Sequence, residues 1–456
     1  MHPSKKSRCR TLPLLAIATA VLGGCASFSP DGGFGDVQKA TKAQIGLDAQ
    51  WNRTASDQET ARQRVSALLT KPLSADDAVQ VALLNNRRLQ AAYGEMGVSE
   101  ADWVQALRLP NPGISFGRLG RGGEVEFDRG LHFNLARLIT APLASGIEAR
   151  RFEQARRLAT LETLSLASET RKAWFTAVAA DESLRFMAQV LKVAAASEEL
   201  ASRMVKVGNW SRLDQAREQG FYADAALNLA RATQAQSAAR ERLTRLMGLW
   251  GDQTAFMLPE RLPELPASPD DKPDLEQQAM TERLDLQAMK AQTAGLAKNM
   301  GLSKVTGLVN VLELGAVRNS FSDGTKERGY EISLELPLFD WGGARVAKAE
   351  ATYMQAVNQL AQAAIEARSE VRQAYTGYRL GYDIARHYRD EIVPLRKRIS
   401  EERQLRYNGM FISVFDLLAD ARDQIGAVNG HIESLRDFWL AQTDLQMALI
   451  GKPSTH

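Results

Sequence analysis

The sequence predicts a mainly α-helical protein with a small β part, built from two copies of one helix, strand pair and long-helix unit. Three observations carry this prediction. Long stretches lack proline, two pairs of short segments alternate apolar and polar residues, and punctuating prolines and glycines recur about 200 residues apart. Pro142-Leu143 matches Pro337-Leu338 at an offset of 195 residues, and Gly208 matches Gly409 at an offset of 201.

The first 24 residues are typical of a lipoprotein signal peptide. Four basic residues precede an apolar stretch from Leu12 to Leu22, which is too short to span a bilayer as a helix. The small residues Gly23 and Gly24 then precede Cys25, which we expect to be lipidated and to become the mature N-terminus. Residue 26 is alanine and not the aspartate that retains many lipoproteins at the inner membrane, which favours the outer membrane.

Charge and cysteine content exclude several classes of function. The chain carries a net charge of +3, and removing the four basic leader residues leaves −1. The positive net charge therefore comes from the leader and does not indicate nucleic-acid binding. The two cysteines are Cys9 in the leader and the lipidated Cys25, so no thiol remains for a disulfide, a nucleophile or a metal cluster. No nucleotide loop, nucleophile elbow or zinc motif occurs, and we expect no enzyme activity, cofactor, metal or nucleic-acid partner.

Residues 25–72 are predicted to be a lipid-anchored tether, and residues 73–250 the first repeat. Ser74 and Asp77 resemble a capping box for a helix that ends near Leu109, before Pro110 and Pro112. Strand candidates cover 113–118 and 130–138. A long helix from Pro142 to Val207 and a shorter one over 212–247 complete the repeat.

Residues 251–273 are predicted to be a Pro-rich linker, and residues 274–452 the second repeat. Its helix covers 274–302, its strands about 305–318 and 328–338, its long helix 344–408 and its last helix 413–450. Each long helix of 65 residues would extend about 100 Å, matched by two shorter helices stacked end to end. Four tilted strands cannot close a barrel, whereas three protomers would supply twelve strands, which predicts a homotrimer with a 12-stranded β-barrel.

This arrangement resembles the TolC family of outer-membrane efflux proteins over nearly all of the mature chain. The resemblance rests on several motifs: Leu83–Leu89, Arg283–Leu286, Tyr388–Pro394, Tyr407–Gly409 with Phe415–Arg422, and Val207–Asp214. The sequence departs from the family where Arg87 follows Asn86 in place of proline, and where Gly301–Lys304 precedes the third strand. The resemblance implies an α-barrel of long-helix hairpins in the periplasm and the passive outer duct of a tripartite efflux or secretion system. The implied partners are a periplasmic adaptor (membrane fusion) protein and an inner-membrane pump.

The helix tips are the predicted periplasmic entrance. Its candidate carboxylates are Asp214, Asp416, Asp420 and Asp423, of which the last three share one helical face. The alternative is that these residues are solvated positions or helix caps that complement the helix dipole. The predicted adaptor contact comprises Gly208, Trp210, Gly409, Met410 and Phe411, and packing against the neighbouring tip is the alternative.

Glu331 and Glu335 are expected to face the barrel lumen, because the residues that alternate with them are apolar. The alternative from another class is a periplasmic coiled-coil adaptor or a structural envelope lipoprotein, which would need no lipid-facing strands. Nothing in the sequence identifies the cargo or the class of pump.

Overall fold

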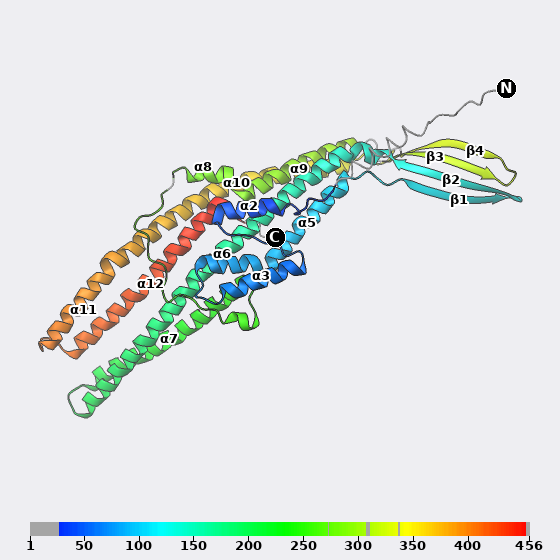
Figure 1. Ribbon diagram of the computed structural model, residues 1–456. Helices are drawn as coiled ribbons and strands as arrows, with labels where there is room; N and C mark the ends of the chain where they lie inside the picture. Colours follow the sequence, from blue (N-terminus) through cyan, green and yellow to red (C-terminus); the bar gives the residue numbers. More distant parts are fainter. Residues whose placement is uncertain (1–26, 272, 307–310, 336–337, 453–456) are drawn as a thin grey trace, which may run out of the picture. The chain divides into compact units, whose positions relative to one another are not determined.

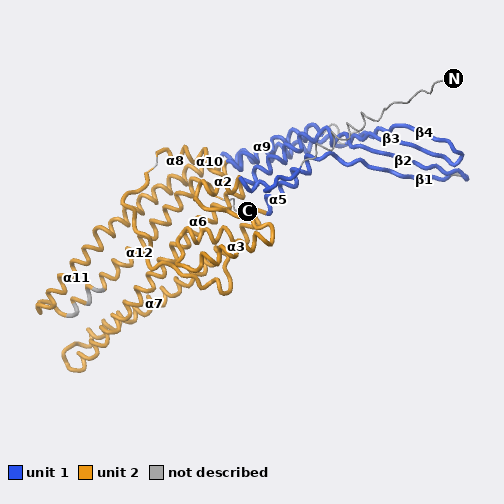
Figure 2. The backbone as a smooth tube through the Cα atoms, viewed as in Figure 1, with its two compact units in different colours: residues 1–35, 94–156, 287–361 blue, residues 36–93, 157–286, 362–456 orange. Residues whose placement is uncertain are grey.

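The computed structural model describes residues 27–271, 273–306, 311–335 and 338–452 (Figure 1). The leader and Cys25 lie outside the described residues. The chain divides into two compact units (Figure 2), and each is considered separately. Unit 1 comprises residues up to 35, 94–156 and 287–361, and it holds the β-sheet. Unit 2 comprises residues 36–93, 157–286 and 362–456 and is helical.

The order of elements repeats, which confirms the predicted fold class. The first copy contains α4 (Ala75–Asn85), α5 (Arg87–Leu107), β1 (Gly113–Arg121), β2 (Glu124–Asn134), α6 (Leu135–Lys206) and α7 (Arg212–Met247). The second contains α8 (Leu275–Glu282), α9 (Leu284–Thr306), β3 (Leu312–Phe321), β4 (Lys326–Leu334), α10 (Gly343–His387), α11 (Val393–Asn408) and α12 (Val414–Ile450). No helix among the described residues is long and apolar enough to cross a bilayer.

The segment predicted to be a tether contains two helices, α2 (Phe34–Ile45) and α3 (Ala55–Leu68). Thr54 and Asp57 form a capping box that starts α3, and Ala61 and Val65 are buried in the main core. The sequence did not predict these helices because the region is mostly polar. Helix α3 buries only a narrow stripe of apolar residues.

Several element boundaries differ from the predictions. The second long helix is interrupted by a π-helical turn, Tyr388–Ile392. Pro394 lacks an N–H group and cannot bond the carbonyl of Asp390, and the N–H of Val393 bonds Tyr388 O instead. The first long helix starts at Leu135 and not at Pro142, because Asn134 Oδ1 accepts a bond of 2.8 Å from the N–H of Arg137.

The predicted strands also shift along the chain. The second strand ends at Asn134 where 138 was expected, and the third begins at Leu312 where 305 was expected. Residues 307–310 lie outside the described residues. The helices predicted over 74–109 and 274–302 are each broken once, at Asn86 and at Arg283.

Side chains at these two breaks bind the C-terminal ends of α7 and α12, which are the last helices of the first and the second repeat. At the first, Asn85 Nδ2 donates to the carbonyls of Met247 (3.2 Å) and Gly248 (2.7 Å), and Asn86 Nδ2 donates to Leu246 O (2.8 Å). These bonds satisfy carbonyls that the end of α7 leaves unpaired. At the second break, Arg283 Nη1 donates to Ala448 O near the end of α12 (3.1 Å). The two repeats therefore use the same geometry with different side chains.

Gly248 ends α7 in a left-handed conformation, with φ of 67°. A Cβ atom there would lie 3.0 Å from Asn85 O, so Gly248→Ala is expected to destabilise the protein by about 1–3 kcal/mol. The measurement is the thermal midpoint of helical circular dichroism. Gly220→Ala is the matched control, because Gly220 lies inside the same helix with open space around it and alanine favours helix. Equal midpoints for the two variants would contradict the strain argument.

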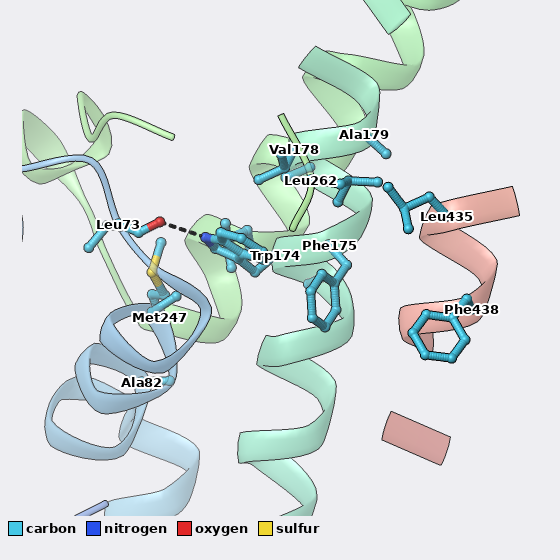
Figure 3. Close-up of a cluster of buried hydrophobic side chains, with 14 of the residues drawn as sticks. Leu73, Ala82, Trp174, Phe175, Val178, Ala179, Met247, Leu262, Leu435 and Phe438 are labelled. Carbon is cyan, nitrogen blue, oxygen red and sulfur yellow. Dashed lines mark hydrogen bonds between the residues drawn. The ribbon is translucent and has the colours of Figure 1, made fainter. Parts of the chain in front are cut away.

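The main hydrophobic core lies in unit 2, where α3, α4, α6, α7, α10 and α12 meet. Figure 3 shows the part of it around Trp174 and Phe175 of α6. Trp174 of α6 is buried there, and its Nε1 donates to Leu73 O at 2.8 Å. Phe175 stacks on Trp439 with ring centroids 5.3 Å apart, and Phe438 is fully buried beside Tyr378 and Tyr382. Aromatic residues of both repeats therefore share one core, which joins the two copies.

Candidate functional site: the helix tips and the sheet

The first helix tip joins α6 to α7 through residues 207–211. Gly208 takes a left-handed conformation with φ of 78°, which glycine adopts without steric cost. Ser211 then caps α7 by accepting a hydrogen bond of 3.1 Å from the N–H of Asp214. Trp210, an expected adaptor anchor, is half-buried.

The second tip joins α11 to α12 through residues 409–413. The left-handed residue there is Met410, with φ of 62°, and not Gly409, whose φ is −79°. A Cβ atom at 409 would lie 2.7 Å from the ring of Phe411, so a larger residue there would displace this exposed ring. Met410 and Phe411 are 92% and 83% exposed, so this tip presents an apolar surface of two large side chains.

The candidate entrance carboxylates have specific partners. Asp416 closes a capping box with Ser413, whose hydrogen bonds lower the pKa of that carboxyl. Asp420 is buried and lies 3.7 Å from Arg403 Nε, and Asp423 pairs with Arg396 at 3.0 Å. The three aspartates of α12 are thus close to arginines of α11.

Asp214 has the same role in the first tip. Its N–H is capped by Ser211, and its carboxylate lies 3.2 Å from Arg217 on the same helix. The structure therefore places all four candidate aspartates near the tips, two of them in caps, as the alternative interpretation expects.

A buried ion pair links the two hairpins above the tips. Glu218 of α7 is 3% exposed and accepts hydrogen bonds from Ser197 Oγ of α6 and Arg422 Nη2 of α12, both at 2.6 Å. The guanidinium of Arg422 also lies 4.4 Å from the ring centroid of Phe221. The hairpin of the first repeat is therefore fastened to the hairpin of the second.

Sequence reasoning missed Glu218 and Arg422. Both lie in polar helical stretches where a charged residue is normally solvated, and no local pattern marks them as partners. Only the side-by-side packing of α7 and α12 brings residues 204 positions apart into contact.

The four strands form one antiparallel sheet in the order β1-β2-β3-β4. Successive residues of a strand alternate between faces, so the register defines the composition of each face. Gly113, His132, Gly315 and Glu331 are opposed across the strands and share the polar face. His132 Nε2 and Ser115 Oγ lie 2.7 Å apart on that face. Glu331 is exposed there, and Glu335, just beyond β4, has the same parity.

The opposite face of the sheet is apolar and exposed. Ile114 and Phe116 of β1 are 85% and 68% exposed, and Tyr330 and Ile332 of β4 are 79% and 60% exposed. Leu131, Phe133, Leu314 and Leu334 continue this face across all four strands. Such an area of exposed apolar side chains marks a surface that is covered by lipid or protein.

Residues 275–409, which cover most of the second repeat, match the family model described as outer membrane efflux protein. The second repeat is thus similar to outer membrane efflux proteins. The chain is 25% identical over 280 residues to the cobalt-zinc-cadmium resistance protein CzcC of Cupriavidus metallidurans. That alignment covers 59% of this chain and 64% of CzcC, so it spans less than two thirds of the relative's length.

Solved outer-membrane channels share the fold. The chain matches CusC with a TM-score of 0.67 and 17% identity, over 85% of this chain and 92% of CusC. It matches the outer-membrane channel OprN with a TM-score of 0.69 and 16% identity, over 90% and 95% of the two chains. The match to VceC of Vibrio cholerae has a TM-score of 0.67 and 14% identity, over 83% and 97%.

The described residues of the chain contain no group of three or more His, Cys, Asp or Glu side chains arranged to hold a metal ion.

Proposed function

We propose that the chain is the outer-membrane duct of a tripartite exporter, anchored through a lipidated Cys25. The observation that carries the proposal is the sheet with one exposed apolar face and one polar face, joined in the chain to two helical hairpins. The duct catalyses nothing, and an inner-membrane pump supplies the energy. A long helical part lies in the periplasm, and the apolar face of the sheet contacts lipid.

The working form is proposed to be a homotrimer. Strands β1 and β4 form the two edges of the sheet and present unpaired backbone groups. Three copies joined edge to edge would supply twelve strands and close the sheet around a pore. The polar face, with Glu331 and Glu335, would then line the pore. A heat-resistant trimer in outer-membrane fractions supports this proposal, and a soluble monomer would support the periplasmic adaptor or structural lipoprotein instead.

The tips are proposed to bind the periplasmic adaptor, with Met410 and Phe411 as the main anchors beside Gly208, Trp210 and Gly409. The variant carrying Met410→Ala and Phe411→Ala is expected to lose about 2–4 kcal/mol of adaptor binding, since two exposed apolar side chains are removed. The measurement is co-purification of the adaptor with the duct. Trp250→Ala, which removes a large exposed apolar side chain outside the tips, is the control for general surface damage. Normal recovery of adaptor by the double variant would place the contact elsewhere.

The entrance of the duct is proposed to lie at the same tips, lined by Asp214, Asp416, Asp420 and Asp423. Changing the three α12 aspartates to asparagine is expected to lower the preference of the trimer for cations in planar bilayers, because a threefold ring of carboxylates attracts cations. Arg396 and Arg403 lie close to two of these aspartates and neutralise part of their charge. Replacing both arginines with glutamine should therefore raise the preference of the trimer for cations. Unaltered selectivity in both variants would argue against these residues as the entrance.

The proposed function is tested by deleting the gene and screening the strain against drugs, dyes, solvents and metal salts. The name of CzcC refers to cobalt, zinc and cadmium resistance, so salts of these metals belong in the screen. If the protein exports compounds, the deletion strain becomes more susceptible to at least one class of them. The wild-type gene should restore resistance, and a gene carrying Cys25→Ser should restore less of it. Unchanged susceptibility across the panel, in a strain whose other exporters are also removed, would contradict export.

A further inference from the structure

Each strand of the sheet carries an arginine on the apolar face. The register opposes Arg129 of β2 to Arg318 of β3, and Arg318 to Arg328 of β4. In β1 the residue opposite Arg129 is Phe116. Arg118 lies two residues further along β1, on the same face and closer to the hairpin turn. We call these four residues the arginine row.

The row has a defined position along the strands. On the side toward the helices, the same face carries only apolar residues, among them Leu131, Ala316 and Tyr330 in the adjacent register positions. On the side toward the hairpin turns, the next positions are Phe127, Ser320 and Lys326. The row therefore lies between an apolar band on the helix side and a mixed stretch toward the hairpin turns, where Phe127 adjoins Ser320 and Lys326.

The charge of the row is not balanced within the described part of the chain. All four arginines are exposed, and none forms an ion pair with a carboxylate of the described residues, although Arg118 lies 5.9 Å from the ring centroid of Phe127. The acidic residues of the strands have the opposite parity and lie on the polar face, as the register of Glu126, Asp128, Glu327 and Glu331 shows. Like charges directly opposite on neighbouring strands repel one another, so this arrangement calls for an external anion.

We propose that the arginine row binds the phosphate groups of lipids in the outer leaflet of the membrane. Guanidinium groups bind phosphate through paired hydrogen bonds, and the adjoining apolar rows suit the acyl chains of the same molecule. A free anion would use the arginines alone and would leave the apolar band uncovered. This inference rests on the proposed function, which places the sheet in the outer membrane with its hairpin turns away from the periplasm.

The experiment measures binding of bisphosphorylated lipid A to the full-length trimer in detergent, by native mass spectrometry. The variant Arg129→Gln, Arg318→Gln, Arg328→Gln is expected to bind this lipid at least about tenfold more weakly than the wild type. The matched control Arg62→Gln, Arg64→Gln, Arg398→Gln removes the same charge from exposed helical positions and is expected to bind as the wild type does. An acyl-matched lipid without phosphates should bind weakly to all three proteins.

Three outcomes would overturn the proposal. In the first, the triple glutamine variant folds and binds lipid A as tightly as the wild type does. In the second, the wild type binds the lipid without phosphates as tightly as lipid A. In the third, inorganic phosphate alone binds the wild type as tightly as lipid A does. Heat resistance of the trimer and circular dichroism show whether the variant folds, and Lys in place of Gln at the three positions provides a milder variant that keeps the charge. Because binding is measured in detergent, its failure is separate from failure of export, which the deletion strain reports.

Discussion

Replacing Arg283 with methionine is expected to destabilise unit 2 by about 3–5 kcal/mol, because it leaves Asp285 without its buried cation and Glu370 with the exposed Lys452 as its remaining cation. Arg283 is 3% exposed at the break between α8 and α9, and it pairs with Asp285 at 2.6 Å and with Glu370 of α10 at 2.9 Å. Burial alone would lower the pKa of the guanidinium, but the bonds to these two carboxylates outweigh it and raise that pKa.

Arg283 also joins three helices, since its Nη1 donates to Ala448 O near the end of α12. The measurement is thermal or denaturant unfolding followed by circular dichroism in detergent. The matched control is Arg372→Met, which breaks an exposed bridge of 3.1 Å between α10 and Glu276 of α8 and should cost less than about 1 kcal/mol. A similar loss in both variants would show that the network at Arg283 contributes no more than a surface pair.

Replacing Arg422 with glutamine is expected to loosen the two hairpins from each other and, under the proposed function, to raise the single-channel conductance of the trimer. The change leaves the buried carboxylate of Glu218 with Ser197 as its remaining partner, which costs about 2–5 kcal/mol of the contact between α7 and α12. Apolar contacts of Ile425 with the cluster around Val190, Ala194 and Ala225 remain, so the fold should survive.

The measurement combines planar-bilayer recordings with a double-mutant cycle of Glu218→Gln and Arg422→Gln. The two substitutions together should be less harmful than Arg422→Gln alone, since the double variant buries no unpaired charge. Arg203→Gln, which removes an exposed i,i+4 pair with Glu199 on α6, should leave conductance unchanged. Wild-type conductance in the Arg422 variant would mean that this ion pair does not hold the entrance.

Much of the fold could be predicted from the sequence because its signals are local. Alternating residues identified the four strands, and the structure confirms the predicted capping box of Ser74 and Asp77. Ser211 and Ser413 cap the last helices of the two repeats at the starts that the sequence predicts. The boundaries were less accurate where a competing local interaction intervenes, as at the Asn134 cap and at the turn before Pro394.

The candidate site could be predicted only in part. The exposed pair Met410 and Phe411 could be predicted because two large apolar residues are adjacent in one short segment. The left-handed conformation of Met410 could not be predicted. The aspartates of α12 were found as a helical stripe, whereas their arginine partners on α11 were not, since pairing depends on how two helices face each other.

The sequence by itself determined most element types, the two-copy order and the resemblance to outer-membrane efflux proteins, because periodicity, caps and repeated motifs are written along the chain. Only the tertiary structure decided the contacts that fasten the copies together. Arg283 with Glu370, Glu218 with Arg422, and the opposition of Arg129, Arg318 and Arg328 all join residues far apart in the chain. A side chain's partner depends on the register and facing of packed elements, and these arise only when the apolar faces of the whole unit are buried together.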